Sequence, residues 1–154
     1  MIKILFVCHG NICRSTMAEF VMKDLVRKAG LSDKFIINSA ATSREEIGSD
    51  THYGTKAKLR EMNIPFTKRK AVQVTKRDYD MYDYIIVMDN NNLRNLKYII
   101  GEDTQHKVYK MMSFAGENRD VKDPWYTGNF DETYMDIDKG CRALLEQLKN
   151  GGNI

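Results

Sequence analysis

Four short apolar runs, each separated from the next by a segment with helical spacing, constrain the fold of this 154-residue chain more than any other feature. The runs predict strands at 2–7, 35–40, 83–89 and 107–111. Helices are predicted at 16–29, 50–62, 90–101 and 131–149. Because strands that alternate with helices form parallel sheets, the pattern predicts an α/β fold with helices on both faces of the sheet.

The ends of these elements follow from local signals. Thr16 and Glu19 have the spacing of a capping box at the start of the first helix, and Gly30 is expected to end that helix. Residues 112–130 contain glycines and an Asp-Pro pair, so we expect a loop there.

Length and composition exclude several classes of protein. A chain of 154 residues without repeats or linkers is expected to form a single domain over 1–154. A net charge of +3, from 24 basic and 21 acidic residues, does not indicate a nucleic-acid partner. The basic run at 68–70 is expected to be solvated. No apolar run approaches the ~20 residues of a membrane span. The N-terminus lacks the features of a signal peptide, so we expect a cytoplasmic protein.

The stretch "CHGNICRS", residues 8–15, follows the first strand and precedes the first helix. Ligands of parallel α/β sheets bind at such junctions. Backbone N–H groups and a helix N-terminus there would favour the thiolate of Cys8. Gly10 would let the backbone approach an anion, and Arg14 would grip two oxygens of an oxyanion. Asn11 would hold the loop through side-chain hydrogen bonds, and Ser15 would donate a hydrogen bond to the Cys8 sulfur.

The other cysteines and the histidines do not indicate a metal site. Cys141 lies on the apolar stripe of the last predicted helix and is expected to be core. Cys8, Cys13 and Cys141 form no CxxC or CxxH pair, and the three histidines are scattered. We therefore expect neither a zinc site nor a permanent disulfide.

Several motifs in order resemble one family. They are "VCHGNICRS", Ala18-Glu19, "SAAT" at 39–42, "MD" at 88–89 and "DPW" at 123–125. Together they resemble the low-molecular-weight protein tyrosine phosphatases from residue 3 to about residue 148. The segments "SREEIG" and "DPWYTGNF" resemble those of bacterial members. The resemblance implies a four-stranded parallel sheet flanked by helices and a phosphate-binding loop after the first strand.

The resemblance also implies roles for particular residues. Cys8 would attack phosphorus to form a phosphocysteine, Arg14 would bind the phosphoryl oxygens, and Asp123 would act first as general acid and then as general base. No metal or cofactor is implied. Cys13 would form a reversible disulfide with Cys8 under oxidation. The residues expected to bind substrate are His9, Gly10, Asn11, Ile12, Cys13, Ser15, Trp125 and Tyr126, with Ser39 as a supporting partner of Asn11.

Substrate class is indicated by position 12. Family members that act on phosphoarginine carry Thr there, so Ile12 favours phosphotyrosine. The implied partner is a phosphotyrosine protein, for example a bacterial tyrosine kinase or its targets. Arsenate reductases on this fold need cysteines at about residues 75–95, where this chain has none. Protein arginine phosphatase and arsenate reductase stay as alternatives. A non-catalytic phosphopeptide-binding module is disfavoured because Cys8, Arg14 and Asp123 are all present.

Overall fold

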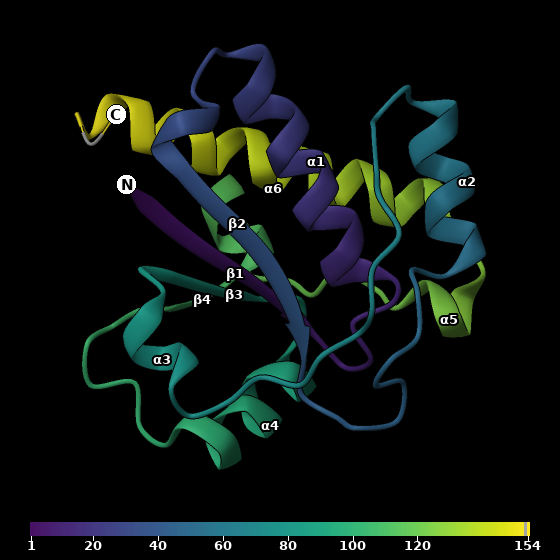
Figure 1. The fold of residues 1–154 in the computed structure, drawn as a ribbon. Coiled ribbons are helices and arrows are strands. Elements are labelled where there is room, and N and C mark those ends of the chain that lie inside the picture. Colours follow the sequence, from purple (N-terminus) through teal and green to yellow (C-terminus); the bar gives the residue numbers. More distant parts are fainter. Residues whose placement is uncertain (153) are drawn as a thin grey trace.

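The computed structural model describes residues 1–152 and 154 and contains a parallel four-stranded sheet in the order β2-β1-β3-β4 (Figure 1). The strands are β1 (Ile2–Cys8), β2 (Phe35–Ala41), β3 (Tyr84–Val87) and β4 (Val108–Lys110). The helices are α1 (Arg14–Lys28), α2 (Tyr53–Glu61), α3 (Asp78–Met81), α4 (Asn90–Ile100), α5 (Pro124–Thr127) and α6 (Phe130–Asn150), with short 3₁₀ helices at Ser32–Lys34 and Met111–Ala115. The predicted α/β fold is confirmed.

Strand β1 is central and pairs in parallel with both β2 and β3. Cys8, its last residue, lies opposite Ala41 of β2, and Val7 lies opposite Val87 of β3. The chain therefore leaves β1 toward one side of the sheet and later returns on the other side. Ligands of such sheets bind at the carboxyl edge where the direction changes, and the loop after Cys8 begins at this edge.

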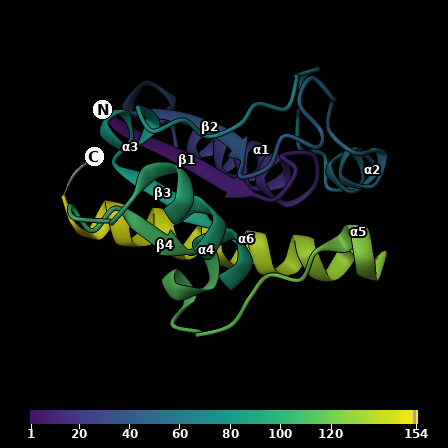
Figure 2. The same cartoon turned by 90° about the horizontal axis from the view of Figure 1, so that it is seen from below.

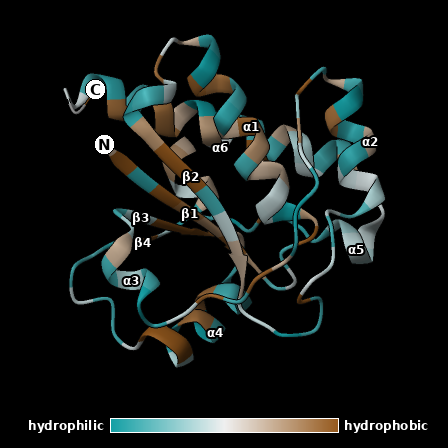
Figure 3. Cartoon of the chain, in the orientation of Figure 1, coloured by the Kyte–Doolittle hydropathy of each residue, from teal (hydrophilic) through white to brown (hydrophobic). Residues whose placement is uncertain are grey.

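Alternate residues of β1 supply two separate cores. Ile4 and Phe6 pack with residues of α1 and α6, whereas Leu5 and Val7 pack with residues of α3 and α4. Figure 1 shows these helix pairs on opposite sides of the sheet. Helix α1 carries both hydrophobic and hydrophilic colour along its length, as expected of a helix with one face against a sheet (Figure 3). Helices α2 and α5 lie together at the end of the molecule away from both termini (Figure 2).

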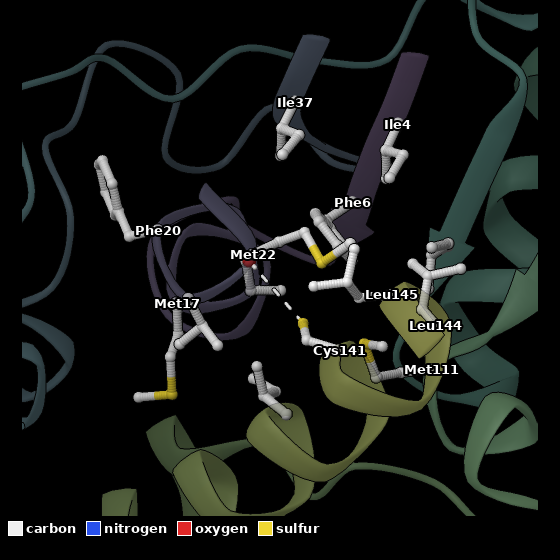
Figure 4. Close-up of a cluster of buried hydrophobic side chains, with 14 of the residues drawn as sticks. Ile4, Phe6, Met17, Phe20, Met22, Ile37, Met111, Cys141, Leu144 and Leu145 are labelled. Atoms are coloured by element: carbon white, nitrogen blue, oxygen red, sulfur yellow. Dashed lines mark hydrogen bonds between the residues drawn. The ribbon is translucent and has the colours of Figure 1, made fainter. Parts of the chain in front are cut away.

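Cys141 lies in the core between α1 and α6, as predicted (Figure 4). Its side chain is completely buried, and Sγ lies 4.0 Å from the carbonyl oxygen of Ala18. Burial raises the pKa of this thiol far above its ordinary value. Cys141 is therefore a packing residue and stays protonated.

The predicted capping box is wrong. Helix α1 begins at Arg14, and its N-cap, Cys13, makes no side-chain capping bond. Thr16 lies within the first turn, and its hydroxyl donates to the carbonyl of Ile12 at 3.1 Å. Glu19 is turned toward Ser39 of β2. Helix α1 begins directly after the loop that follows Cys8. Arg14 and Ser15 therefore belong to its first turn, two residues before the predicted start.

The sequence predicts a loop at 112–130, but two short helices interrupt this segment. One is the 3₁₀ helix that ends at Ala115, and the other is α5, with Pro124 at its first position. Asp123 caps α5 by accepting a hydrogen bond from the N–H of Trp125. Helix α3 was also not predicted. None of the helices in the described part of the chain combines the length and hydrophobicity of a membrane span.

Candidate active site

The chain turns sharply after β1 and returns to Cys8 within one loop. Asn11, at φ +59°, adopts the left-handed conformation that this turn requires. Ser15, in the first turn of α1, then lies beside the sulfur: its hydroxyl is 3.0 Å and its backbone nitrogen 3.4 Å from Cys8 Sγ. Two potential donors therefore face this sulfur, and both stabilise a negative charge on it.

Arg14 is held in place by groups from three other segments. Nη1 donates to Asp89 Oδ2 at 2.7 Å and to the carbonyl of Val121 at 2.8 Å, and Nη2 donates to Asp123 Oδ2 at 3.4 Å. Only 2% of the Arg14 side chain is exposed. Nε is buried and has no hydrogen-bond partner among the described residues. A buried guanidinium N–H without a partner is costly, so this edge suits a bound oxyanion.

The charge of Arg14 is maintained despite its burial. Desolvation lowers the pKa of the guanidinium, but the neighbouring Cys8, Asp123 and Asp89 raise it, and the net shift is upward. Arg14 is therefore a permanent cation at the base of the site.

A pocket of about 100 Å³ lies between this loop and α5. Asp123 lines it together with Cys8 and Arg14, and Trp125 and Tyr126 stand at its mouth, 57% and 81% exposed. The remaining wall residues are His9, Gly10, Ile12, Cys13, Glu45 and Glu46. Glu45 and Glu46 were not predicted from the sequence. His9 Nε2 lies 2.8 Å from Glu45 Oε2, which gives the histidine a partner at the rim.

Cys13 lines the same pocket as Cys8 but differs from it chemically. Burial raises the pKa of Cys13 to about 12, and the negative charges of Cys8 and Asp123 add to this shift. Cys13 therefore stays a neutral thiol at physiological pH and is a weak nucleophile.

Asn11 and Ser15, which the sequence places among the substrate-binding residues, do not line the pocket. Asn11 Nδ2 donates to Ser15 Oγ at 2.8 Å and to Ser39 Oγ at 3.0 Å, and Ser39 Oγ donates to Glu19 Oε1 at 2.5 Å. The loop and β2 are thereby joined behind the site.

Arg69 also reaches this network, so the prediction that the run 68–70 is entirely solvated is wrong. The side chain of Arg69 is 14% exposed and donates to the carbonyl oxygen and the Oδ1 of Asn11. Lys68 and Lys70 are exposed, as predicted. Nothing in a run of three basic residues distinguishes the middle one, so no local signal could have identified Arg69.

His52 lies beneath the rim formed by Trp125. Its ring centroid is 5.6 Å from that of Trp125 and 5.4 Å from that of Phe130, and Nδ1 accepts a hydrogen bond from the N–H of Gly54. The backbone N–H of His52 donates to the carbonyl of Ile12. This residue therefore joins α2, the loop after β1 and the aromatic rim.

The fold and this geometry define a class: an α/β protein whose thiol and guanidinium share one oxyanion-binding loop at the end of the central strand, with a carboxyl group in the same small pocket. A family model described as low molecular weight phosphotyrosine protein phosphatase matches residues 3–153. The chain belongs to this family.

Individual relatives support the assignment. The chain is 40% identical over 151 residues to the low molecular weight protein-tyrosine-phosphatase YfkJ of Bacillus subtilis, covering 97% of each. The crystal structure of YfkJ superposes with a TM-score of 0.94 over 98% of this chain and 96% of that one. A low molecular weight protein tyrosine phosphatase from Streptococcus pyogenes is 43% identical, with a TM-score of 0.85 and coverage of 96% and 93%. A drosophila arginine phosphatase is 28% identical, with a TM-score of 0.87.

Proposed function

We propose that this protein hydrolyses phosphotyrosine in proteins and peptides through a phosphocysteine intermediate. The observation that carries the proposal is the convergence of Cys8, Arg14 and Asp123 on one pocket, with the buried Nε of Arg14 left for an oxyanion. A thiolate, a fixed cation and a carboxyl group are the three groups that the two-step reaction needs.

In the first step, the Cys8 thiolate attacks phosphorus while the phosphoryl oxygens bind to Arg14 and the loop amides. The bond from phosphorus to the tyrosyl oxygen breaks, and the protonated Asp123 carboxyl gives its proton to that oxygen. In the second step, Asp123 takes a proton from water, whose oxygen attacks phosphorus. The bond to sulfur breaks, and Cys8 leaves as a thiolate stabilised by the hydroxyl of Ser15.

An aromatic substrate fits the walls of the pocket. Trp125 and Tyr126 offer exposed rings at the mouth, and Ile12 lines the pocket as an apolar residue. Ile12 also disfavours phosphoarginine, although one relative is titled an arginine phosphatase. The absence of cysteine from about residue 75 to 95 disfavours arsenate reduction.

The natural substrate is a phosphotyrosine protein, for example a bacterial tyrosine kinase or one of its targets. We place the reaction in the cytoplasm. All three cysteines are free, which suits a reducing compartment, where thiols such as Cys8 stay reduced.

One preparation tests the proposal against its alternatives. A phosphotyrosyl peptide, free phosphoarginine and arsenate with a thiol reductant are supplied in parallel without added metal, and turnover is compared. We expect the phosphotyrosyl peptide to be preferred by at least about tenfold. A preference for phosphoarginine or arsenate would replace the proposed substrate.

The nucleophile is tested with Cys8→Ser, whose fold is checked by its thermal transition. We expect its turnover to fall to background while the phosphotyrosyl peptide still binds. Turnover that survives this substitution would contradict the phosphocysteine mechanism.

A further inference from the structure

We propose that the groove between α2 and the start of α6 is a second binding site for the substrate, which takes an apolar side chain about three residues from the phosphotyrosine. The groove has a volume of about 430 Å³, and residues of α2, Gly128 and the first turn of α6 line it. This role rests on the proposed phosphatase function, because the groove would bind the segment that flanks the phosphotyrosine.

The walls of the groove offer apolar surface. Tyr53 and Ala57 of α2 are exposed, and Phe130 of α6 is half-buried. The Phe130 ring packs directly on the backbone of α2, because a Cβ at Gly54 would come within 2.3 Å of that ring. The absence of a side chain at position 54 therefore lets the two helices share one apolar surface.

The charge at the edge of the groove disfavours an anionic occupant. Lys58 is only 11% exposed, and its Nζ pairs with carboxylates of both α2 and α6. The positive charge of Lys58 is thus already matched by nearer groups. An apolar centre with a polar edge is the arrangement found where proteins bind peptides and other proteins.

A strip of aromatic rings joins the groove to the catalytic pocket. Trp125 lines the pocket, and its ring centroid lies 5.6 Å from that of His52, which stacks on Tyr53 at 4.3 Å. Helix α5 makes the same connection: Trp125 and Tyr126 line the pocket, whereas Gly128, its C-cap, lines the groove. Helices α2 and α5 lie at the same end of the molecule (Figure 2). The groove is therefore continuous with the pocket that would hold the phosphotyrosine.

The exposure of these rings indicates a contact surface. Tyr53 is 80% exposed, and Trp125 and Tyr126 are exposed as well. Large apolar side chains that gather on a surface commonly mark a binding site. A phosphotyrosine protein brings its own flanking segment to Trp125 and Tyr126, so this segment is the occupant that the continuity of pocket and groove favours.

The spacing of the rings sets which residue of the substrate reaches the groove. Through their shared neighbour His52, the ring centroids of Trp125 and Tyr53 are at most about 10 Å apart, a distance that about three residues of extended peptide cover at ~3.3 Å each. A leucine three positions from the phosphotyrosine would therefore lie over Tyr53 and Ala57, where its apolar surface leaves water.

Phosphotyrosyl peptides that differ at one position test the groove. One pair carries Leu or Ser three residues after the phosphotyrosine, and a second pair carries Leu or Ser three residues before it. In one of these pairs we expect kcat/KM to be about tenfold higher for the Leu peptide, mainly through KM, because the groove binds ground state and transition state alike. Equal kcat/KM within both pairs would overturn the proposal.

Two variants locate the effect. Tyr53→Ala removes one wall of the groove, and Ala57→Gln fills it with a polar side chain. We expect both to reduce the preference for Leu to less than about twofold. Tyr98→Ala is the matched control and should keep the wild-type preference, because Tyr98 is 84% exposed on α4, which packs on the other face of the sheet. A preference for Leu that survives in both groove variants would overturn the proposal.

Two further measurements separate the groove from the proposed function and from self-association. Turnover of p-nitrophenyl phosphate reports the catalytic pocket alone, and fluorescence anisotropy with Cys8→Ser reports peptide affinity without turnover. If no ester is hydrolysed but the Leu peptide binds more tightly than the Ser peptide, the proposed function fails and the groove stands. Hydrolysis of the peptides without a preference for Leu has the opposite meaning. In sedimentation velocity, a dimer of the wild type that Tyr53→Ala abolishes would assign the groove to a second copy of this chain and overturn the proposal.

Discussion

Arg14 and Asp89 form an ion pair at the base of the pocket, with Nη1 and Oδ2 2.7 Å apart and the arginine almost fully buried. The other oxygen of Asp89 caps helix α4 by accepting from the N–H of Asn92 at 2.7 Å. One carboxylate therefore holds the catalytic cation against a helix that follows β3. The pairing leaves the buried Nε of Arg14 without a partner among the described residues, so this edge can receive an oxyanion.

Replacement of Asp89 tests this orientation. In Asp89→Asn the cap of α4 can persist, because Asn is a good N-cap residue, but the ion pair is lost. We expect the free energy of unfolding to fall by about 1–3 kcal/mol, and inhibition by inorganic phosphate to weaken severalfold. Urea denaturation and inhibition assays measure both. The exposed Asp80→Asn is the control, and phosphate inhibition equal to the wild type would show that Asp89 does not orient Arg14.

Asp123→Asn tests the general acid. The carboxamide can still cap α5 but cannot protonate a leaving oxygen. We expect kcat for phenyl phosphate to fall by about 10²-fold or more, with a smaller loss for p-nitrophenyl phosphate, whose leaving group needs less protonation. Asp131→Asn, at an exposed position of α6, should leave both rates unchanged. Equal losses for the two esters would exclude Asp123 as the proton donor.

Selective alkylation tests whether the three thiols differ in reactivity. Cys13, whose pKa is raised to about 12, and the buried Cys141 are both poor nucleophiles near neutral pH. We therefore expect iodoacetamide to modify Cys8 first and activity to be lost in step with that single modification. Peptide mapping by mass spectrometry measures the order, and inorganic phosphate should slow it. Early labelling of Cys13 would contradict the assignment.

Peroxide treatment tests the predicted redox pairing. Peroxide oxidises the Cys8 thiolate to a sulfenic acid, and the Cys13 thiol then displaces water to form a disulfide. We expect the wild type to recover most of its activity with a thiol reductant, and Cys13→Ser to recover much less after the same exposure. Equal recovery of activity by the wild type and Cys13→Ser would contradict a protective role of Cys13.

His52 makes stability depend on pH. Burial lowers its pKa below the ordinary value of 6.5, although Asp123 and Glu46 oppose the shift, and its Nδ1 must be unprotonated to accept from Gly54. The unfolded chain therefore binds the proton more readily, so stability is retained above pH ~6.5 and is lost as pH falls toward the folded-state pKa. Urea denaturation between about pH 5 and pH 8 should show a smaller acid slope in His52→Asn, which keeps the cap but does not titrate in this range. An identical slope would contradict this role.

The sequence by itself determined the α/β class and the residues of the loop after β1. These features depend on local patterns: the apolar run of β1, the glycine and asparagine of the turn, and the residues that follow at the start of α1. Cys8, Arg14 and Ser15 are close in space because they are close in the chain. Asp123, far from them in sequence, could be assigned only because the chain resembles a known family.

Only the tertiary structure decided which distant groups hold that loop. Asp89 pairs with Arg14 across 75 positions of sequence, and Arg69 donates hydrogen bonds to Asn11 across 58 positions. Glu19 accepts a hydrogen bond from Ser39 instead of capping α1, and the Arg69 side chain is only 14% exposed between two exposed lysines. A side chain's partners depend on which strands lie side by side, and spacing along one segment carries no information about that. The reactive residues of the loop after β1 are thus identified by local sequence, whereas the groups that position them are brought there only by folding.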